Sequence, residues 1–346
     1  GFNEYYPTYI YVGQYIRNVF KCIITHNSIP TFDFSIGWGN DIITTLNYFG
    51  LGDIFNITAA LTSAQHSETL LTLTILLKIY VAGISFSIWG RYHTLSSPAL
   101  LTAAIFYAFN GYTYAFGLLF PPYIVAQVTL PLLILGIDIL LESKKIWRVS
   151  YILILSIFIQ ALNGFYSLYM EAIFCIIYFF VKFFTLYKRQ WKNFFLRACN
   201  ILWQCLLGIG MASVLFLPIL LEFLKSPRSK ESSFSLIQII EMFPLDTWME
   251  RLEGLITGPG YGSGLGLCAV AIVCMITIYK IPSKHLELKI LLTIFGVGYC
   301  LPIMGSVMNG FSYSTERWLF LLYFLIATII AKVLPDLEHI SGIQSS

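Results

Sequence analysis

Long apolar runs alternate with short polar segments along most of the chain. From residue 69 onward, many runs approach the roughly 20 residues that a helix needs to cross a bilayer. Because lipid offers no hydrogen-bond partner to backbone amides, such runs must be helical. We therefore predict nine membrane-spanning helices, at about 69–90, 98–117, 122–141, 149–163, 165–184, 198–223, 263–281, 289–304 and 317–333.

Two longer segments are less apolar than the rest. In the first, residues 1–68, Tyr5, Tyr9 and Val12 fall on one helical face, which predicts a helix at the membrane interface. The second carries an amphipathic run, Phe234–Phe243, followed by a glycine-rich turn. The predicted organisation is a loop segment 1–68, six spans in 69–223, a loop with a surface helix in 224–262, three spans in 263–334 and a polar tail in 335–346.

The fourth and fifth runs meet at Asn163-Gly164, and the fourth is short. The pattern over 149–184 allows either a complete hairpin or a broken, re-entrant one. The composition agrees with a membrane protein, since 57% of residues are hydrophobic and only 11% are charged, against roughly 25% charged in soluble domains. We predict an all-α, polytopic membrane protein. The net charge of +3 is too small to indicate a nucleic-acid partner, and none is expected.

Lysine and arginine follow every odd-numbered run, whereas the alternate short loops hold almost none. By the positive-inside rule, the basic loops are cytoplasmic and residues 1–68 and 224–262 are extracellular. An external first segment requires an earlier span, so we expect this sequence to be part of a longer chain. The basic residues that follow odd-numbered runs are Arg91, Lys144, Lys145, Arg148, Lys182, Lys188, Arg189, Lys192, Arg197, Lys280, Lys284, Lys289 and Lys332.

One polar stretch, Phe32–Asn56, carries three carboxylates in glycine-rich turns: Asp33, Asp41 and Asp53. Glycine permits tight turns that present such side chains. The stretch is either a solvated loop or a site. Clustered carboxylates allow a divalent metal ion, although no ligand spacing requires one. The seven cysteines show no paired spacing and are interpreted as small apolar residues.

Lys78, Asp138 and Glu171 are ionisable residues inside the predicted spans, where such residues are functional by default. Lys78 could bind a phosphate or pair with a carboxylate. Asp138 is close to the inner end of its span and is interpreted as an interfacial acid. Glu171 lies about a third of the way down from the outer face, and we leave structural pairing and the lining of a cavity open for it.

Several motifs together resemble one family. They are FDFSIGWGNDIITTLNYFGLGDIFN at 32–56, NGFYSLY at 163–169, NGFSYSTERW at 309–318, AQVTLPLLIL at 126–135 and Tyr5-Tyr6-Pro7. In this order they resemble the bacterial YfhO family of multi-span membrane proteins, which look like GT-C type glycosyltransferases. Family members are longer, with further spans after this point.

The resemblance implies transfer of a sugar from a polyprenyl-phosphate-linked donor to a cell-wall polymer, such as teichoic acid, on the outer face of the cell membrane. It implies an acidic residue just before the first residues of this sequence, so the leading catalytic acid would lie outside it. Such a reaction needs a carboxylate base and a cation for the leaving phosphate. The expected catalytic residues are Asp41, Asp53 and Glu4. The expected substrate-binding residues are Arg317, Asn163, Tyr166, Asn309, Tyr313 and Lys78.

Two other classes of function fit the same pattern. A transporter or flippase of lipid-linked precursors would use ionisable residues near the midplane, and Lys78 would serve. A non-catalytic assembly protein would need the acids only as turn residues.

Overall fold

A computed structural model describes residues 2–187, 190–225, 242–257, 264–281 and 284–343. Within these ranges the chain is helical apart from its loops and one short hairpin. The hairpin pairs β1 (Phe32–Asp33) with β2 (Asn40–Asp41) in an antiparallel arrangement. The predicted all-α, polytopic class is confirmed.

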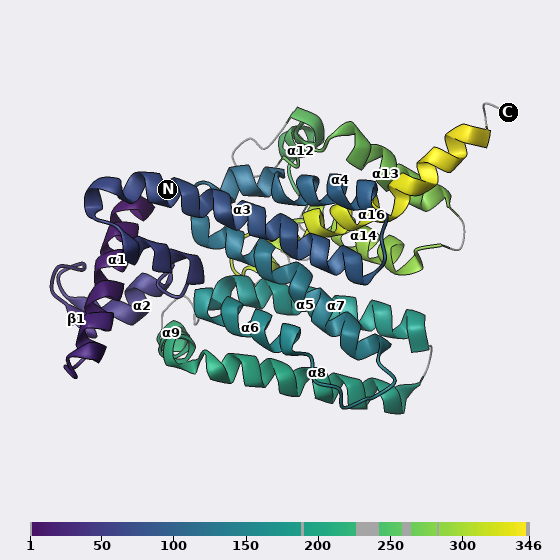
Figure 1. Cartoon of the computed structure of the whole chain (residues 1–346). Helices are drawn as coiled ribbons and strands as arrows, with labels where there is room; N and C mark the ends of the chain where they lie inside the picture. Colours follow the sequence, from purple (N-terminus) through teal and green to yellow (C-terminus); the bar gives the residue numbers. More distant parts are fainter. Residues whose placement is uncertain (1, 188–189, 226–241, 258–263, 282–283, 344–346) are drawn as a thin grey trace.

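Residues 2–66 form an N-terminal lobe at one end of the molecule (Figure 1). Tyr5, Tyr9 and Val12 of its first helix share one face and are fully buried within the protein, and the position of this helix at the membrane interface stays a prediction. The two tyrosines pack with Ala59 of the lobe and Leu71 of the bundle. The helical elements of the lobe are α1 (Phe2–Ile24), α2 (Ile42–Asn47) and the 3-10 helices η1 (Ile54–Leu61) and η2 (Ala64–His66).

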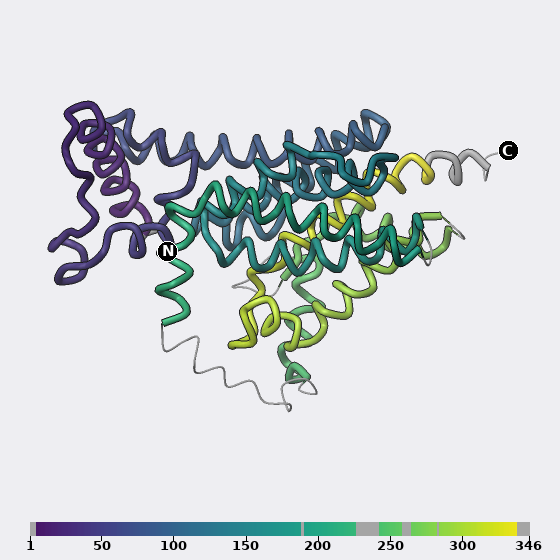
Figure 2. The backbone as a smooth tube through the Cα atoms, turned by 90° about the horizontal axis from the view of Figure 1, so that it is seen from below, coloured from purple at the N-terminus to yellow at the C-terminus, as the bar shows by residue number. Residues whose placement is uncertain are grey.

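Beyond the lobe, the helices run back and forth along one long direction (Figures 1 and 2). The first six alternate, so that α3, α5 and α7 lead away from the lobe and α4, α6 and α8 return towards it. Their bounds are α3 (Ser67–Tyr92), α4 (Ser97–Ala108), α5 (Ile124–Glu142), α6 (Tyr151–Asn163), α7 (Phe165–Tyr187) and α8 (Trp191–Met211), with a π-helical turn η3 (Thr113–Gly117) and a 3-10 turn η4 (Pro121–Tyr123) between α4 and α5.

Of the remaining helices, α9 packs beside α8 and the lobe helix α2, and the last helix of the chain enters the core of the bundle (Figure 1). Helix α16 packs against α4 and α13, and it continues through Pro335. Residues 335–343 are therefore helical, where the sequence indicated a polar tail. The bounds are α9 (Ser213–Lys225), α12 (Leu245–Thr257), α13 (Ala269–Lys280), α14 (Leu286–Tyr299), α15 (Pro302–Met308) and α16 (Leu319–Ile343).

The end of the bundle opposite the lobe collects the basic connections, and we call it the basic end. Helices α3, α5, α7 and α13 finish there, and α4, α6, α8 and α14 begin there (Figure 1). Arg91 and Lys280 lie in the last turns of α3 and α13, and Lys144 directly follows α5. The predicted separation of the acidic loop from the basic loops is therefore present along the long axis.

The predicted count of nine spans is too high for the described residues. Each predicted run contains a helix, but only five helices are long and apolar enough to cross a membrane, or six if the bent pair α14–α15 counts as one span. Helices α4, α6 and α13 have only 12, 13 and 12 residues. A 12-residue helix rises about 18 Å, which is shorter than a hydrocarbon layer of about 30 Å.

Two of the predicted runs are also broken. The run 289–304 bends by 100° between α14 and α15, because Pro302 begins a new helix and Leu301 before it is extended. The run 198–223 divides at Ala212, between α8 and α9. Short α6 and span-length α7 meet at Gly164. The predicted surface helix at 234–243 falls almost wholly outside the described residues, as does the glycine-rich turn at 258–262.

Candidate functional site

The lobe meets the bundle at the turn Phe120–Tyr123, which precedes α5. The ring of Phe120 packs against Tyr5, Tyr48 and Phe49 of the lobe, with centroids 4.9–6.2 Å apart. Two carbonyl groups of this turn accept hydrogen bonds from residues singled out in the sequence. Lys78 donates to the carbonyl of Pro121 at 3.3 Å, and Asn163 donates to that of Pro122 at 3.1 Å.

Lys78 pairs with Asp53, one of the three loop acids. Both side chains have no exposed surface, and the ammonium contacts Oδ2 of the carboxylate directly. The other oxygen, Oδ1, caps η1 by accepting from the backbone N–H of Phe55 at 3.0 Å. Burial raises the pKa of Asp53, and the Lys78 ammonium opposes that shift. The pair joins the lobe to α3, and it leaves neither charge available to a ligand.

Close backbone contact explains why Asp53 reaches α3. A Cβ atom at Gly52 would lie 1.8 Å from the carbonyl oxygen of Leu162, so no larger residue fits against the end of α6. Asn47 donates to that same carbonyl at 2.9 Å. The glycines of the loop therefore let its backbone dock on α6, as well as forming turns.

Arg317 lies just before α16 and beside Tyr123, the last residue of the Phe120–Tyr123 turn. Its guanidinium carbon is 5.8 Å from the ring centroid of Tyr123 and 5.7 Å from that of Tyr166. The side chain is partly exposed. Among the described residues, no carboxylate forms an ion pair with it. An arginine stays charged at any physiological pH, so this position presents a positive charge held between two tyrosine rings.

The other predicted binding residues lie close to Arg317 in the chain or in space. Tyr166 provides one of its two rings. Asn309 donates to the carbonyl of Tyr313 at 2.9 Å, which closes the loop before Arg317, and Tyr313 itself is exposed. The Oδ1 atom of Asn163 is buried and has no hydrogen-bond partner among the described residues.

Asp41 forms no hydrogen bond or ion pair with this group in the described part of the chain, and it lies where the lobe faces α9. It caps α2 by accepting from the backbone N–H of Thr44 at 2.8 Å. It also lines an open hollow of about 350 Å³ between the lobe and α9, together with Glu222 and Lys225. No hydrogen bond or ion pair connects Asp41 or Asp53 with Arg317 among the described residues.

Asp33 and Glu4 are the two remaining acids of the lobe. The hydroxyl of Tyr11 and the backbone N–H of Ser35 bond to Asp33 and lower its pKa. Asp33 is thus a turn residue on the hairpin. Glu4 lies within α1, but its side chain is outside the described residues.

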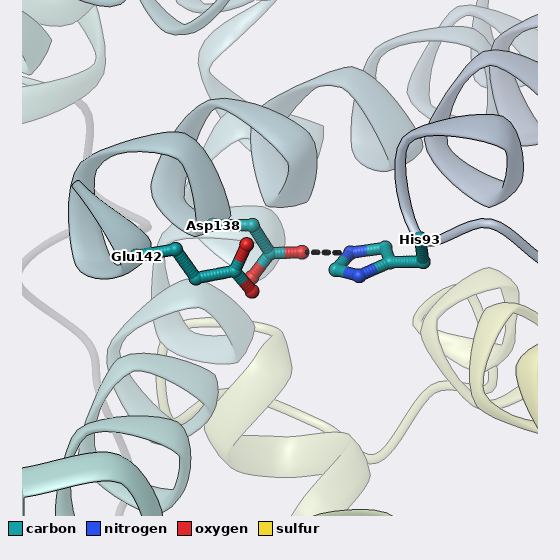
Figure 3. Close-up of side chains that lie close together, drawn as sticks. All are labelled: His93, Asp138 and Glu142. Carbon is teal, nitrogen blue, oxygen red and sulfur yellow. Dashed lines mark hydrogen bonds and ion pairs between the residues drawn. The ribbon is translucent and has the colours of Figure 1, made fainter.

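A second polar cluster lies at the basic end (Figure 3). Asp138 lies one turn before the end of α5, as expected, but it has no exposed surface and is enclosed by the protein. It accepts from four donors, whose nitrogen or oxygen atoms lie 2.6–3.2 Å away. They are Trp89, His93, Tyr178 and Lys182.

His93, Asp138 and Glu142 are residue types that bind metal ions, and one ligand atom of each lies within 4.8 Å of the others. The Lys182 ammonium, however, lies 2.6 Å from Asp138 and 2.9 Å from Glu142. This is the position between two carboxylates that a cation would take. We interpret the cluster as a buried ion pair with a lysine as its cation. A small cavity of about 170 Å³ adjoins it.

Glu171 belongs to a network inside the bundle. Its Oε1 atom is 2.8 Å from the hydroxyl of Thr129, which also bonds to Gln160 at 3.0 Å. The Oε2 atom of Glu171 and the Nε2 atom of Gln160 have no partner among the described residues. No cation there pairs with Glu171, so structural pairing with a charge is not observed.

The pair Arg251–Glu316 was not predicted. Arg251 of α12 is 4% exposed and contacts the carboxylate of Glu316 directly. It also donates to the carbonyl of Tyr299 at 2.8 Å. No local pattern in the sequence indicated this pair.

The helices, their hydrophobicity and the buried charges define a multi-pass helical membrane protein. The family model for the bacterial membrane protein YfhO matches residues 9–346. The chain therefore belongs to the YfhO family. No curated protein and no solved structure matches it.

Proposed function

We propose that the chain is part of a membrane glycosyltransferase of the bacterial envelope. It transfers a sugar from a polyprenyl-phosphate-linked donor to a cell-wall polymer such as teichoic acid. Membership of the YfhO family supports the membrane setting, and the activity is the one that the resemblance of the sequence motifs implies. We further propose that the lobe faces outward, because the basic connections gather at the opposite end of the bundle.

Arg317 is the observation on which the proposal rests. Its charge has no carboxylate partner among the described residues, and the rings of Tyr123 and Tyr166 flank it. A charge placed at the end of a membrane bundle favours an anion at the same depth. The phosphate of a lipid-linked sugar lies at this depth, and arginine binds phosphate with two parallel hydrogen bonds. As the sugar leaves, the guanidinium stabilises the negative charge that develops on the phosphate.

Asp41 is the better candidate for the base among the described loop acids. It is partly exposed and lines an open hollow, whereas Asp53 is enclosed with Lys78. A base must reach the hydroxyl whose proton it takes, and the hollow is the accessible space beside a predicted catalytic acid. Glu222 and Lys225 in the same hollow suit a polymer that carries hydroxyl and phosphate groups.

The test of the cation is a sugar analysis of purified cell wall from cells that carry Arg317→Met in the full-length protein. We expect loss of the transferred sugar, and partial retention with Arg317→Lys, because lysine keeps the charge but not the paired donors. Arg91→Met, on an exposed arginine at the basic end, is the matched control. Unchanged glycosylation with Arg317→Met would overturn the proposal.

Asp41→Asn tests the base separately. Asparagine also caps helices well, so α2 should persist while proton transfer is lost. Asp33→Asn on the same hairpin is the control, since among the described residues the Asp33 side chain bonds only to Ser35 and Tyr11 of the lobe. We expect Asp41→Asn to abolish transfer and Asp33→Asn to leave it intact. Equal transfer by both variants would remove Asp41 from catalysis.

A transporter of lipid-linked precursors is the alternative, and the structure weakens its main support. Lys78 was the midplane charge that favoured transport, but it is paired with Asp53 and fully buried. Movement of a labelled lipid-linked sugar across vesicles that contain the full-length protein, without a transfer product, would favour transport instead.

A further inference from the structure

Helix α12 presents one buried charge to the bundle, Arg251. Its guanidinium contacts Glu316, donates to the Tyr299 carbonyl at 2.8 Å and lies over the rings of Phe243 and Tyr299 at 3.9 and 4.8 Å. These contacts fix the group on several sides. The helix itself is held in place, because the N–H groups of Gly266 and Leu267 bond to carbonyls at the end of α12.

Glu316 and Arg317 are neighbours in the chain, yet their side chains have different partners. Glu316 contacts Arg251, and Arg317 lies between Tyr123 and Tyr166. The backbone before them is tightly packed, since a Cβ at Gly305 would lie 2.4 Å from Ser314 and 2.7 Å from Thr315. The chain therefore enters α16 along a tightly packed path, on which the two side chains take different partners.

We propose that Arg251 is a positioning residue for an anion site at Arg317. By pairing with Glu316, it holds the only acid adjacent to Arg317 in the chain away from it and leaves the Arg317 guanidinium for a phosphate. The inference rests on the proposed function, because the phosphate in question is that of the lipid-linked donor. Arg251 itself touches no substrate in this account.

Without Arg251, Glu316 and a phosphate would compete for the guanidinium of Arg317. A carboxylate that loses its buried partner is left uncompensated, and the nearest alternative cation in the chain is Arg317. A phosphate would then have to displace Glu316 or share the guanidinium with it. At short range in a partly buried site, repulsion from the Glu316 carboxylate is strong enough to lower the affinity for a phosphate by about tenfold or more. Removing the negative charge of Glu316 as well should abolish that effect.

The experiment measures binding of a polyprenyl monophosphate to the purified full-length protein in lipid nanodiscs. The variants are Arg251→Met, Glu316→Gln, the double variant Arg251→Met/Glu316→Gln, Arg317→Met and the control Arg91→Met. Thermal unfolding is followed for each. We expect Arg251→Met to bind at least about tenfold more weakly, which corresponds to about 1.4 kcal/mol. Glu316→Gln and the double variant should bind within about twofold of the native protein.

Thermal unfolding separates positioning from a merely structural role, because the double variant of a buried pair also recovers stability. Rescue of binding supports positioning when Arg251→Met is as fully folded at the assay temperature as the double variant. Weak binding by both Arg251→Met and the double variant, with both folded, would overturn the inference. Native binding by folded Arg251→Met would also overturn it. If Arg251→Met does not fold, the double variant and Glu316→Gln still decide, because weak binding by either contradicts the expected effect.

The outcomes for this inference and for the proposed function are distinct. If Arg317→Met binds the lipid phosphate like the native protein, the anion site and the proposed function fail together. If Arg317→Met loses binding but the Arg251 variants do not follow the expected pattern, only the role of Arg251 fails.

Discussion

At the scale of single residues, buried charges decide which predicted groups can act. Lys78, Asp53 and Asp138 each have full burial and a direct opposite charge. Arg317 is the contrasting case, with tyrosine rings in place of a carboxylate. A paired buried charge stabilises the arrangement of its elements, whereas a charge without an ionic partner is available for a ligand.

The Lys78–Asp53 pair should behave as a unit. Lys78→Met or Asp53→Asn alone leaves a buried group without its partner, and we expect each to destabilise the protein by about 3–5 kcal/mol. The double variant Lys78→Met/Asp53→Asn should recover much of that loss, because no charge remains buried. Thermal unfolding of the full-length protein in detergent measures both effects, with exposed Lys144→Met as control. A double variant less stable than either single one would contradict the coupling.

At the basic end, two acids that share Lys182 should differ in their importance. Asp138 is fully buried and accepts from four donors, whereas the Glu142 side chain is 35% exposed. We expect Asp138→Asn to destabilise the protein by at least about 2 kcal/mol, because buried donors lose their acceptor. Glu142→Gln should cost less than about 1 kcal/mol, because the Glu142 side chain is partly exposed and water screens its pair with Lys182. Thermal unfolding compares the two, and equal losses would show that Asp138 is not the centre of the cluster.

Sequence reasoning identified most of these residues but not their partners. The sequence allowed either a phosphate or a carboxylate as the partner of Lys78. Three loop acids in similar glycine-rich surroundings were candidates for the carboxylate. Only the docking of Gly52 on Leu162 determines which acid reaches α3. The Arg251–Glu316 pair joins residues 65 apart in the chain, and no local pattern specifies such a contact.

At the scale of elements, apolar runs located the helices but overestimated their lengths. Hydrophobicity reports that a segment avoids water, and it does not report where the helix bends. Pro302 splits one run and Ala212 lies between two helices of another. Helices α4, α6 and α13 are shorter than a bilayer. The contact between the lobe and the bundle depends on close approach of the backbones, such as that of Gly52 to Leu162, which hydrophobicity does not report.

Gly52→Ala tests this contact between the lobe and α6. The added methyl group would meet the carbonyl of Leu162, so the lobe has to shift. Overpacking of this kind costs about 1–3 kcal/mol, and we expect earlier thermal unfolding and faster proteolysis within residues 2–66. Gly210→Ala in α8 is the matched control, because nothing lies within 4 Å of its Cβ position, and alanine favours a helix. Equal behaviour of the two variants would show that the lobe does not rest on α6 as described.

At the scale of the whole molecule, the chain is polarised along its length. The lobe with its acids is at one end, the basic connections are at the other, and α16 lies in the core between them (Figure 2). The sequence predicted this separation from the order of charges alone, because alternate helices return the chain to the same end. Which end faces outward follows only from the positive-inside rule, so it stays a prediction.

Accessibility in intact cells tests that prediction. In a full-length protein without its native cysteines, we place one cysteine by Ser63→Cys in the lobe or by Lys145→Cys at the basic end, both at exposed positions. A thiol reagent that cannot cross membranes should label position 63 and leave position 145 unlabelled until the cells are opened. Labelling of position 145 alone would show that the protein has the opposite orientation in the membrane. Arg317 and Asp41 would then face the cytoplasm, and a donor with its phosphate at the outer surface could not reach them.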